Sequence, residues 1–176
     1  TTGTPKAALL RHEHLVSYIL GSVEFMGAMP EEATLVSVPP YHIAGISAVM
    51  SSIYACRRQV QLANFDADTW VQLCKDEGVT NAFVVPTMLT RIIDVLDEQD
   101  DAQAAFPQLA AIAYGGGKMP VPVIERALKL MPDVNFTNAY GLTETSSTIT
   151  LLDPTDHREA ISDTHLRQRL GSVGKA

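Results

Sequence analysis

The sequence predicts an α/β fold in which a mostly parallel sheet is flanked by helices. Short apolar runs alternate with amphipathic stretches and recur roughly every 20 to 25 residues, which is typical of successive strand–helix units. The expected strands cover residues 34–38, 59–62, 81–85, 110–114 and 135–140. Because such sheets bind ligands at the carboxyl ends of their strands, we expect the site residues to follow the strands.

Amphipathic spacing between these runs predicts the helices. They are expected over residues 12–26, 43–55, 86–99 and 121–131, with one more through Trp70 and Cys74. Pro86 suits a first helical turn, and Asp66 or Asp68 could cap the helix that Gly78 would end. The polar, acidic residues 97–105 are expected to form a solvated loop.

Composition limits the class of protein. The 176 residues are 46% hydrophobic and 19% charged, which is typical of a globular domain. The net charge of -7 disfavours a nucleic-acid partner, since phosphate binding usually needs a basic face. Cys56 and Cys74 lack metal or redox spacing, and no apolar run approaches the ~20 residues that a membrane-spanning helix needs. These features predict a cytoplasmic protein without a transmembrane segment.

Both ends of the sequence fall inside turn-rich segments. The chain starts at Thr1 in a Thr/Gly/Pro run, and it stops at Ala176 in a Gly-Lys-Ala turn. We therefore expect residues 1–176 to be a single-domain fragment of a longer protein.

Residues 1–6, Thr-Thr-Gly-Thr-Pro-Lys, combine hydroxyls, a flexible backbone and a lysine, as a phosphate cradle does. They do not form a Walker A loop, and neither do residues 171–176, where Ala176 supplies no hydroxyl for magnesium. A solvent-exposed turn is the alternative for residues 1–6.

Residues 39–42, Pro-Pro-Tyr-His, follow the first expected strand. Two prolines end the strand ladder and leave Tyr41 and His42 at its carboxyl edge. The alternative for His42 is a capping or hydrogen-bonded core histidine.

Residues 115–117 are three glycines placed directly after a strand. They would let the backbone pass close to a flat or bulky ligand. A tight turn with positive φ is the alternative, although a single glycine would satisfy it.

Residues 138–145, Asn-Ala-Tyr-Gly-Leu-Thr-Glu-Thr, offer several chemical groups together. Tyr140 presents an aromatic face for a base, Gly141 a turn, and Glu144 a carboxylate for a hard cation. The alternative is a capped turn with a surface glutamate.

Taken together, these segments resemble the adenylate-forming superfamily of acyl-CoA synthetases, aryl-CoA ligases, peptide-synthetase adenylation domains and luciferases. Residues 1–6 are similar to its T-T-G-x-P-K loop, 39–42 to P-x-[FY]-H, 115–120 to G-G-x-x-[ML]-x, 138–144 to Y-G-x-T-E, and 171–175 to G-S-V-G-[KR]. Order and spacing agree along the whole chain. Ala7 departs from the glycine that usually follows the loop lysine.

The resemblance implies a part of the large N-terminal domain of an acyl-CoA synthetase-like enzyme, without its C-terminal domain. The implied reaction uses ATP and Mg²⁺ to turn a carboxylic acid into acyl-AMP and then forms a thioester with coenzyme A. Transfer to a carrier-protein thiol and an inactive nucleotide-binding fragment are alternatives. The isolated chain is expected to be inactive.

The resemblance also implies roles for single residues. Tyr140 would lie against adenine and Asn138 at its edge, Thr143 on the α-phosphate, Glu144 on Mg²⁺, and His42 beside the acyl carboxylate. Thr143, Glu144 and His42 are the implied catalytic residues. The implied cofactor-binding residues are Thr1, Thr2, Gly3, Thr4, Lys6, Gly115, Gly116, Gly117, Asn138, Ala139, Tyr140, Gly141 and Thr143.

The acid is expected to be a fatty or other apolar acid. Ile46, Val49 and Met50 follow His42 on a helix, and with the glycines at 115–117 they suit an apolar acyl or aryl group. This expectation places the protein in fatty-acid metabolism.

Overall fold

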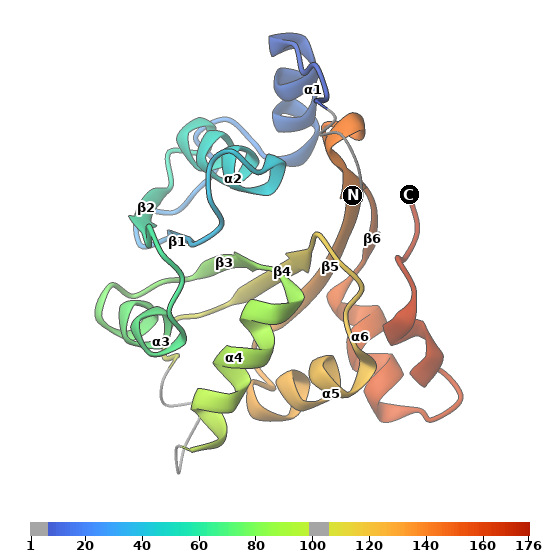
Figure 1. Ribbon diagram of the computed structural model, residues 1–176. Coiled ribbons are helices and arrows are strands. Elements are labelled where there is room, and N and C mark those ends of the chain that lie inside the picture. The colour runs from blue at the N-terminus through green and yellow to red at the C-terminus, as the bar shows by residue number, and fades with distance from the viewer. Residues whose placement is uncertain (1–6, 99–105) are drawn as a thin grey trace.

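A six-stranded sheet with the order β2-β1-β3-β4-β5-β6 forms the centre of the molecule (Figure 1). The computed structural model describes residues 7–98 and 106–176. The strands are β1 (Ala33–Val36), β2 (Arg58–Gln61), β3 (Asn81–Val84), β4 (Ala111–Gly115), β5 (Asn135–Leu142) and β6 (Ser147–Leu152). Strands β1 to β5 run parallel, and β6 pairs antiparallel with β5. The expected α/β fold with a mostly parallel sheet is confirmed.

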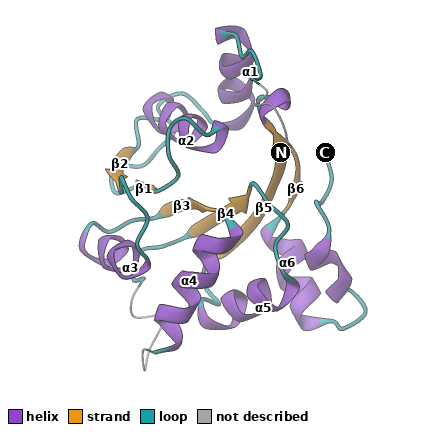
Figure 2. Ribbon diagram, viewed as in Figure 1, coloured by secondary structure: helices purple, strands orange, loops and turns teal. Residues whose placement is uncertain are grey.

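Helices cover the two faces of the sheet unequally (Figure 2). One face carries α1 (His12–Ser22) and α2 (Ile43–Tyr54), and the other carries α3 (Ala67–Asp76), α4 (Pro86–Asp97), α5 (Val121–Leu130) and α6 (Pro154–Ser162). Short 3-10 helices, η2 (Thr143–Thr145) and η3 (Arg167–Gly171), follow β5 and α6. Within the described ranges, no helix is long and apolar enough to cross a membrane.

Side chains alternate along each strand, so one face of the sheet is apolar and the other is more polar. Leu35, Ala82, Ile112 and Phe136 are aligned across β1, β3, β4 and β5, and all are buried against α3 to α6. The neighbouring row, one residue earlier in each strand, faces α1 and α2. Its members are Thr34, Asn81, Ala111 and Asn135, of which Asn135 differs because its Oδ1 accepts a hydrogen bond from Arg158 of α6. The large apolar core therefore lies on one face only.

Helix α4 shows how the core is built from a sequence pattern. Leu89, Ile92, Ile93 and Leu96 recur at the spacing of one helical face, and each is at most 1% exposed. Full burial of such side chains stabilises a fold by about 1.5 to 3 kcal/mol each. The apolar face predicted for this segment is thus the face that packs on the sheet.

Most expected element boundaries agree with the structure within a few residues. Asp66, rather than Asp68, caps α3, because its Oδ1 accepts the backbone N–H of Thr69 at 2.9 Å. Gly78 follows α3 with φ of +56°. Helix α1 ends at Ser22, earlier than expected. Most of the expected acidic loop, residues 99–105, lies outside the described residues.

The expectation that Gly141 forms a turn is wrong, because β5 continues to Leu142. Gly141 pairs with Thr148 at an irregularity in the β5–β6 ladder. A Cβ atom at this position would lie 1.7 Å from the carbonyl oxygen of Ser147. Gly141 is needed for the close approach of the two strands.

Candidate functional site

A cleft of about 570 Å³ opens at the carboxyl ends of β4 and β5. It gathers the sequence-predicted residues from three separate segments. Those that line it are His42, Gly115, Gly116, Gly117, Asn138, Ala139, Tyr140, Gly141, Thr143 and Glu144. The remaining candidates, Thr1, Thr2, Gly3, Thr4 and Lys6, lie outside the described residues.

His42 caps helix α2 and also faces the cleft. Its Nδ1 accepts the backbone N–H of Ala44 at 3.3 Å, so the neutral ring carries its proton on Nε2. The ring lies beside the glycine turn, since a Cβ atom on Gly116 would be 3.9 Å from His42 Cε1. The capping bond therefore leaves an N–H donor on Nε2 for an anionic group.

The three glycines after β4 have three different structural settings. A Cβ atom on Gly115 would lie 2.2 Å from the Ala139 carbonyl oxygen, so the pairing of β4 with β5 requires glycine there. Gly116 has φ of +77°, which favours glycine for backbone reasons. Gly117 has neither constraint, because its Cβ atom would make an ordinary contact of 3.7 Å with Pro86. Of the three glycines, Gly117 is therefore the one that the fold itself does not require.

Tyr140 and Asn138 have different surroundings on β5. Tyr140 is 40% exposed and lines the cleft, where its ring is free to stack on a planar group. Asn138 is buried, and its Nδ2 donates to the carbonyl oxygen of Ser172 at 3.0 Å. This bond ties β5 to the segment that closes the cleft on its other side.

Thr143 and Glu144 stand on the short helix η2. The turn is braced by the hydroxyl of Thr145, which accepts the backbone N–H of Leu142 at 2.9 Å. Glu144 is exposed in the cleft, and the described residues place no cation within ion-pair distance of it. Its carboxylate is available to a metal ion.

The donor set around Glu144 fits magnesium in one particular way. Among residues 7–98 and 106–176, no group of three or more His, Cys, Asp or Glu side chains could hold a metal ion. Mg²⁺ usually needs only one or two carboxylates when phosphate oxygens complete its shell. Glu144 therefore suits a magnesium ion that arrives with a phosphate ligand.

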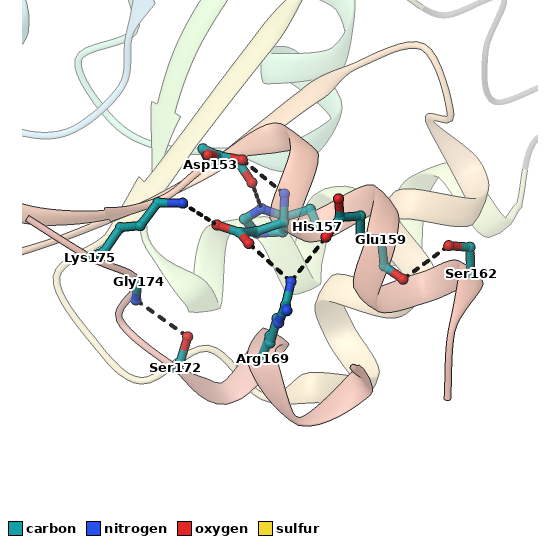
Figure 3. A network of polar contacts seen from close by, with 9 residues as sticks. Asp153, His157, Glu159, Ser162, Arg169, Ser172, Gly174 and Lys175 are labelled. Atoms are coloured by element: carbon teal, nitrogen blue, oxygen red, sulfur yellow. Dashed lines mark hydrogen bonds and ion pairs between the residues drawn. The ribbon is translucent and has the colours of Figure 1, made fainter. Parts of the chain in front are cut away.

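The wall of the cleft formed by residues 171–173 is anchored to α6 (Figure 3). Arg169 pairs with Asp156 at 3.3 Å and with Glu159 at 3.0 Å, and Lys175 lies 3.8 Å from Asp156. On the strand side, the Thr150 hydroxyl donates to the carbonyl oxygen of Val173 at 2.7 Å. Sequence reasoning missed Thr150, Asp156, Glu159 and Arg169, although Asp153-Pro154 predicts a helix start. Lys175 belongs to the 171–175 segment that the sequence analysis singled out.

A buried polar pair connects this same helix to the strand that carries the glycines. Tyr114 Oη lies 2.8 Å from His157 Nε2, and both residues are fully buried. His157 Nδ1 lies 2.7 Å from the Asp153 carbonyl oxygen, which can only accept. Nδ1 therefore carries the proton, and Nε2 accepts from Tyr114. Burial lowers the pKa of His157 and keeps the ring neutral.

A second hollow, a groove of about 700 Å³, runs over the opposite face of the sheet beneath α2. Ala139 belongs to both hollows, so the groove begins where the cleft ends. The side of α2 that lines it carries Ala44, Ser47, Ala48 and Ser51. Ile46, Val49 and Met50, the residues expected to line an acyl pocket, are not part of its lining.

The sequence model of the family described as "AMP-binding enzyme" matches residues 1–176. The chain belongs to the AMP-binding enzyme family. The adenylate-forming resemblance is confirmed at this level.

Relatives within the AMP-binding enzymes include a 2-succinylbenzoate–CoA ligase of Bacillus cereus. It is 31% identical over 175 residues, which are 99% of this chain and 33% of the relative. The o-succinylbenzoate CoA synthetase of Bacillus subtilis in complex with its acyl-adenylate intermediate superposes with a TM-score of 0.77. The identity is 26%, over 99% of this chain and 32% of that one. The same Bacillus subtilis enzyme with ATP and magnesium gives a TM-score of 0.69 at 27% identity, over 93% and 30%. The chain thus spans about one third of the length of these relatives.

Proposed function

We propose that the protein, at its full natural length, activates a carboxylic acid with ATP and then joins the acyl group to coenzyme A. The observation that carries this proposal is the cleft itself. It combines an aromatic face at Tyr140, an open backbone at Gly117, a carboxylate at Glu144 that no described cation pairs with, and an N–H donor at His42. The aromatic face and the open backbone suit an adenine ring. The carboxylate suits the metal ion of a triphosphate, and the N–H donor suits the carboxylate of an acid.

The residues of the cleft would have different roles in the first step, the formation of acyl-AMP. Tyr140 and the backbone of Gly117 hold the adenine between them, and the Thr143 hydroxyl donates to the α-phosphate. His42 Nε2–H orients the carboxylate of the acid. Glu144 would hold Mg²⁺, which would neutralise phosphate charge and so lower the repulsion between the two anions. One carboxylate oxygen attacks the α-phosphorus, and the bond to pyrophosphate breaks.

In the second step a thiol attacks the acyl carbon and AMP leaves. Coenzyme A is the proposed acceptor, because the relatives are named as CoA ligases. The acyl part lies in the groove beneath α2, which begins at Ala139 beside the adenine cleft. A carrier-protein thiol as the acceptor would use the same first step.

The role of Glu144 gives the sharpest test. We expect Glu144→Gln to reduce ATP–pyrophosphate exchange at limiting Mg²⁺ at least tenfold, since each factor of ten corresponds to about 1.4 kcal/mol of transition-state stabilisation. Excess Mg²⁺ should restore part of the rate. Glu98→Gln, at an exposed glutamate after α4, is the matched control and should leave exchange unchanged.

The products separate the proposal from its rivals. AMP and pyrophosphate that depend on an added acid support adenylation, and acyl-CoA formed with free coenzyme A supports the proposed acceptor. ADP as the product would contradict the proposal. Equal exchange by Glu144→Gln and wild type would show that Glu144 does not hold the metal. The 176-residue chain by itself is expected to bind nucleotide without turnover.

A further inference from the structure

The groove beneath α2 is lined by several hydroxyl groups, and two of them lack partners among the described residues. The hydroxyls of Thr34 and Ser47 line the groove, belong to residues that are 7% and 4% exposed, and make no hydrogen bond with any described group. A buried hydroxyl without a partner costs about 1 to 3 kcal/mol, so such groups usually meet a ligand or an ordered water molecule.

The position of the Thr34 hydroxyl relative to the adenine cleft follows from the strand register. Thr34 is aligned through Asn81 and Ala111 with Asn135, at the start of β5. Ala139, where the groove meets the adenine cleft, stands four residues further along that strand. At a rise of about 3.3 Å per residue, the row that contains Thr34 is about 13 Å from the cleft along the strands.

The walls of the groove between these points are formed by small side chains. Ala113 and Ala139 form part of its floor, and Ala44 and Ala48 form part of the α2 wall. These residues leave room for a carbon chain or a ring, and the Thr137 hydroxyl, two residues before Ala139 on β5, lines the same stretch. Among the hydroxyls of the groove, those of Thr34 and Ser47 differ from Thr137 and the others because they are buried without a partner among the described residues.

The charged groups of the groove disfavour a second carboxylate at the far end of the acid. Arg57 lines it but is paired with Glu32, with Nε 2.7 Å from Oε2, and both side chains are mostly buried. Lys175 also lines it and lies 3.8 Å from Asp156. A second carboxylate at Arg57 would have to displace Glu32, whereas a hydroxyl or a carbonyl would not. The Lys175 side chain is 75% exposed, so water and salt screen its charge.

From this arrangement we infer that the preferred acid carries a neutral hydrogen-bonding group, a hydroxyl or a carbonyl, at the end remote from its carboxylate. Thr34 and Ser47 hold that group. This inference rests on the proposed function, and it replaces the apolar acid expected from Ile46, Val49 and Met50.

The test compares three acids of equal length that end in a methyl, a hydroxyl or a carboxylate group. In ATP–pyrophosphate exchange with the full-length protein, kcat/KM for the ω-hydroxy acid should exceed that for each of the other two at least tenfold. Thr34→Val and Ser47→Ala should each reduce this preference. Both variants should fold, because each removes a hydroxyl that has no partner.

Ser37 provides a matched control for these variants. Its hydroxyl is also buried and has no partner among residues 7–98 and 106–176, but it does not line the groove. Ser37→Ala should keep the full preference. Preference for the alkyl or the dicarboxylic acid, or an unchanged preference in Thr34→Val, would overturn the inference and leave adenylation intact. Absence of exchange with every acid would refute the proposed function and this inference together.

Discussion

The hydrogen bond between Tyr114 and His157 should be a measurable part of the stability of this fold. Tyr114→Phe removes the hydroxyl and leaves His157 Nε2 buried without a donor. An unsatisfied buried acceptor costs about 1 to 3 kcal/mol. For a protein of this size, a loss near 2 kcal/mol corresponds to a fall in Tm of about 4 to 8 °C.

A double-mutant cycle separates this bond from the effect of the ring itself. In a His157→Leu background the Tyr114 hydroxyl has lost its acceptor, so Tyr114→Phe now removes an unsatisfied group. There it should be neutral or stabilising. The coupling between the two substitutions should therefore be about 2 kcal/mol.

Urea unfolding followed by circular dichroism gives the four free energies that the cycle needs. The same decrease for Tyr114→Phe in both backgrounds would show that the two side chains do not interact and would refute the tautomer assigned to His157. A coupling below about 0.5 kcal/mol would have the same meaning.

Three further outcomes follow from local geometry. Because the pKa of His157 is lowered in the folded state, the unfolded chain binds its proton more readily, and the free energy of unfolding should fall as pH decreases below about 6.5; His157→Leu should flatten this slope in a urea series from pH 7 to pH 5. Gly115→Ala should destabilise the fold by about 3 kcal/mol or weaken β4–β5 pairing, since its Cβ atom would overlap the Ala139 carbonyl oxygen. Gly117→Ala should keep wild-type stability, and an equal Tm for both glycine variants would contradict this difference. Asp66→Ala should cost about 1 kcal/mol by removing the α3 cap, and unchanged unfolding in urea would show that the cap is not used.

The sequence allowed prediction of the five parallel strands because short segments with apolar residues recur at regular intervals, separated by helical patterns. The signal is weakest in β2, where Val60 is the one apolar residue. The sequence did not lead to β6, although Thr148 and Thr150 alternate with Ile149 and Leu151 as a half-buried strand requires. The turn before β6 contains Ser146 at φ of +56°, without the glycine that normally marks such a turn. Without a glycine to mark the turn, β6 was not predicted.

The cleft was predictable from the sequence, whereas the lining of the groove was not. Residues such as His42 and Tyr140 stand at or just after strand ends, and parallel strands bring their carboxyl ends to one edge. The orientation of α2 needs tertiary information, because apolar side chains occur on more than one side of this helix. Ser47 is buried toward the groove, and its neighbour Ile46 is not part of the groove lining. His157 was missed for a similar reason, since Tyr114 is 43 residues away in sequence.

The separation of the two faces of the sheet determines what a substitution in a strand affects. The side chains that hold the fold together, such as Leu35 and Ile112, point to one side, and those that line the groove, such as Thr34 and Asn81, point to the other. Adjacent positions in a strand therefore have different structural roles. Substitutions among the groove residues change the shape and polarity of the hollow while the hydrophobic core stays intact.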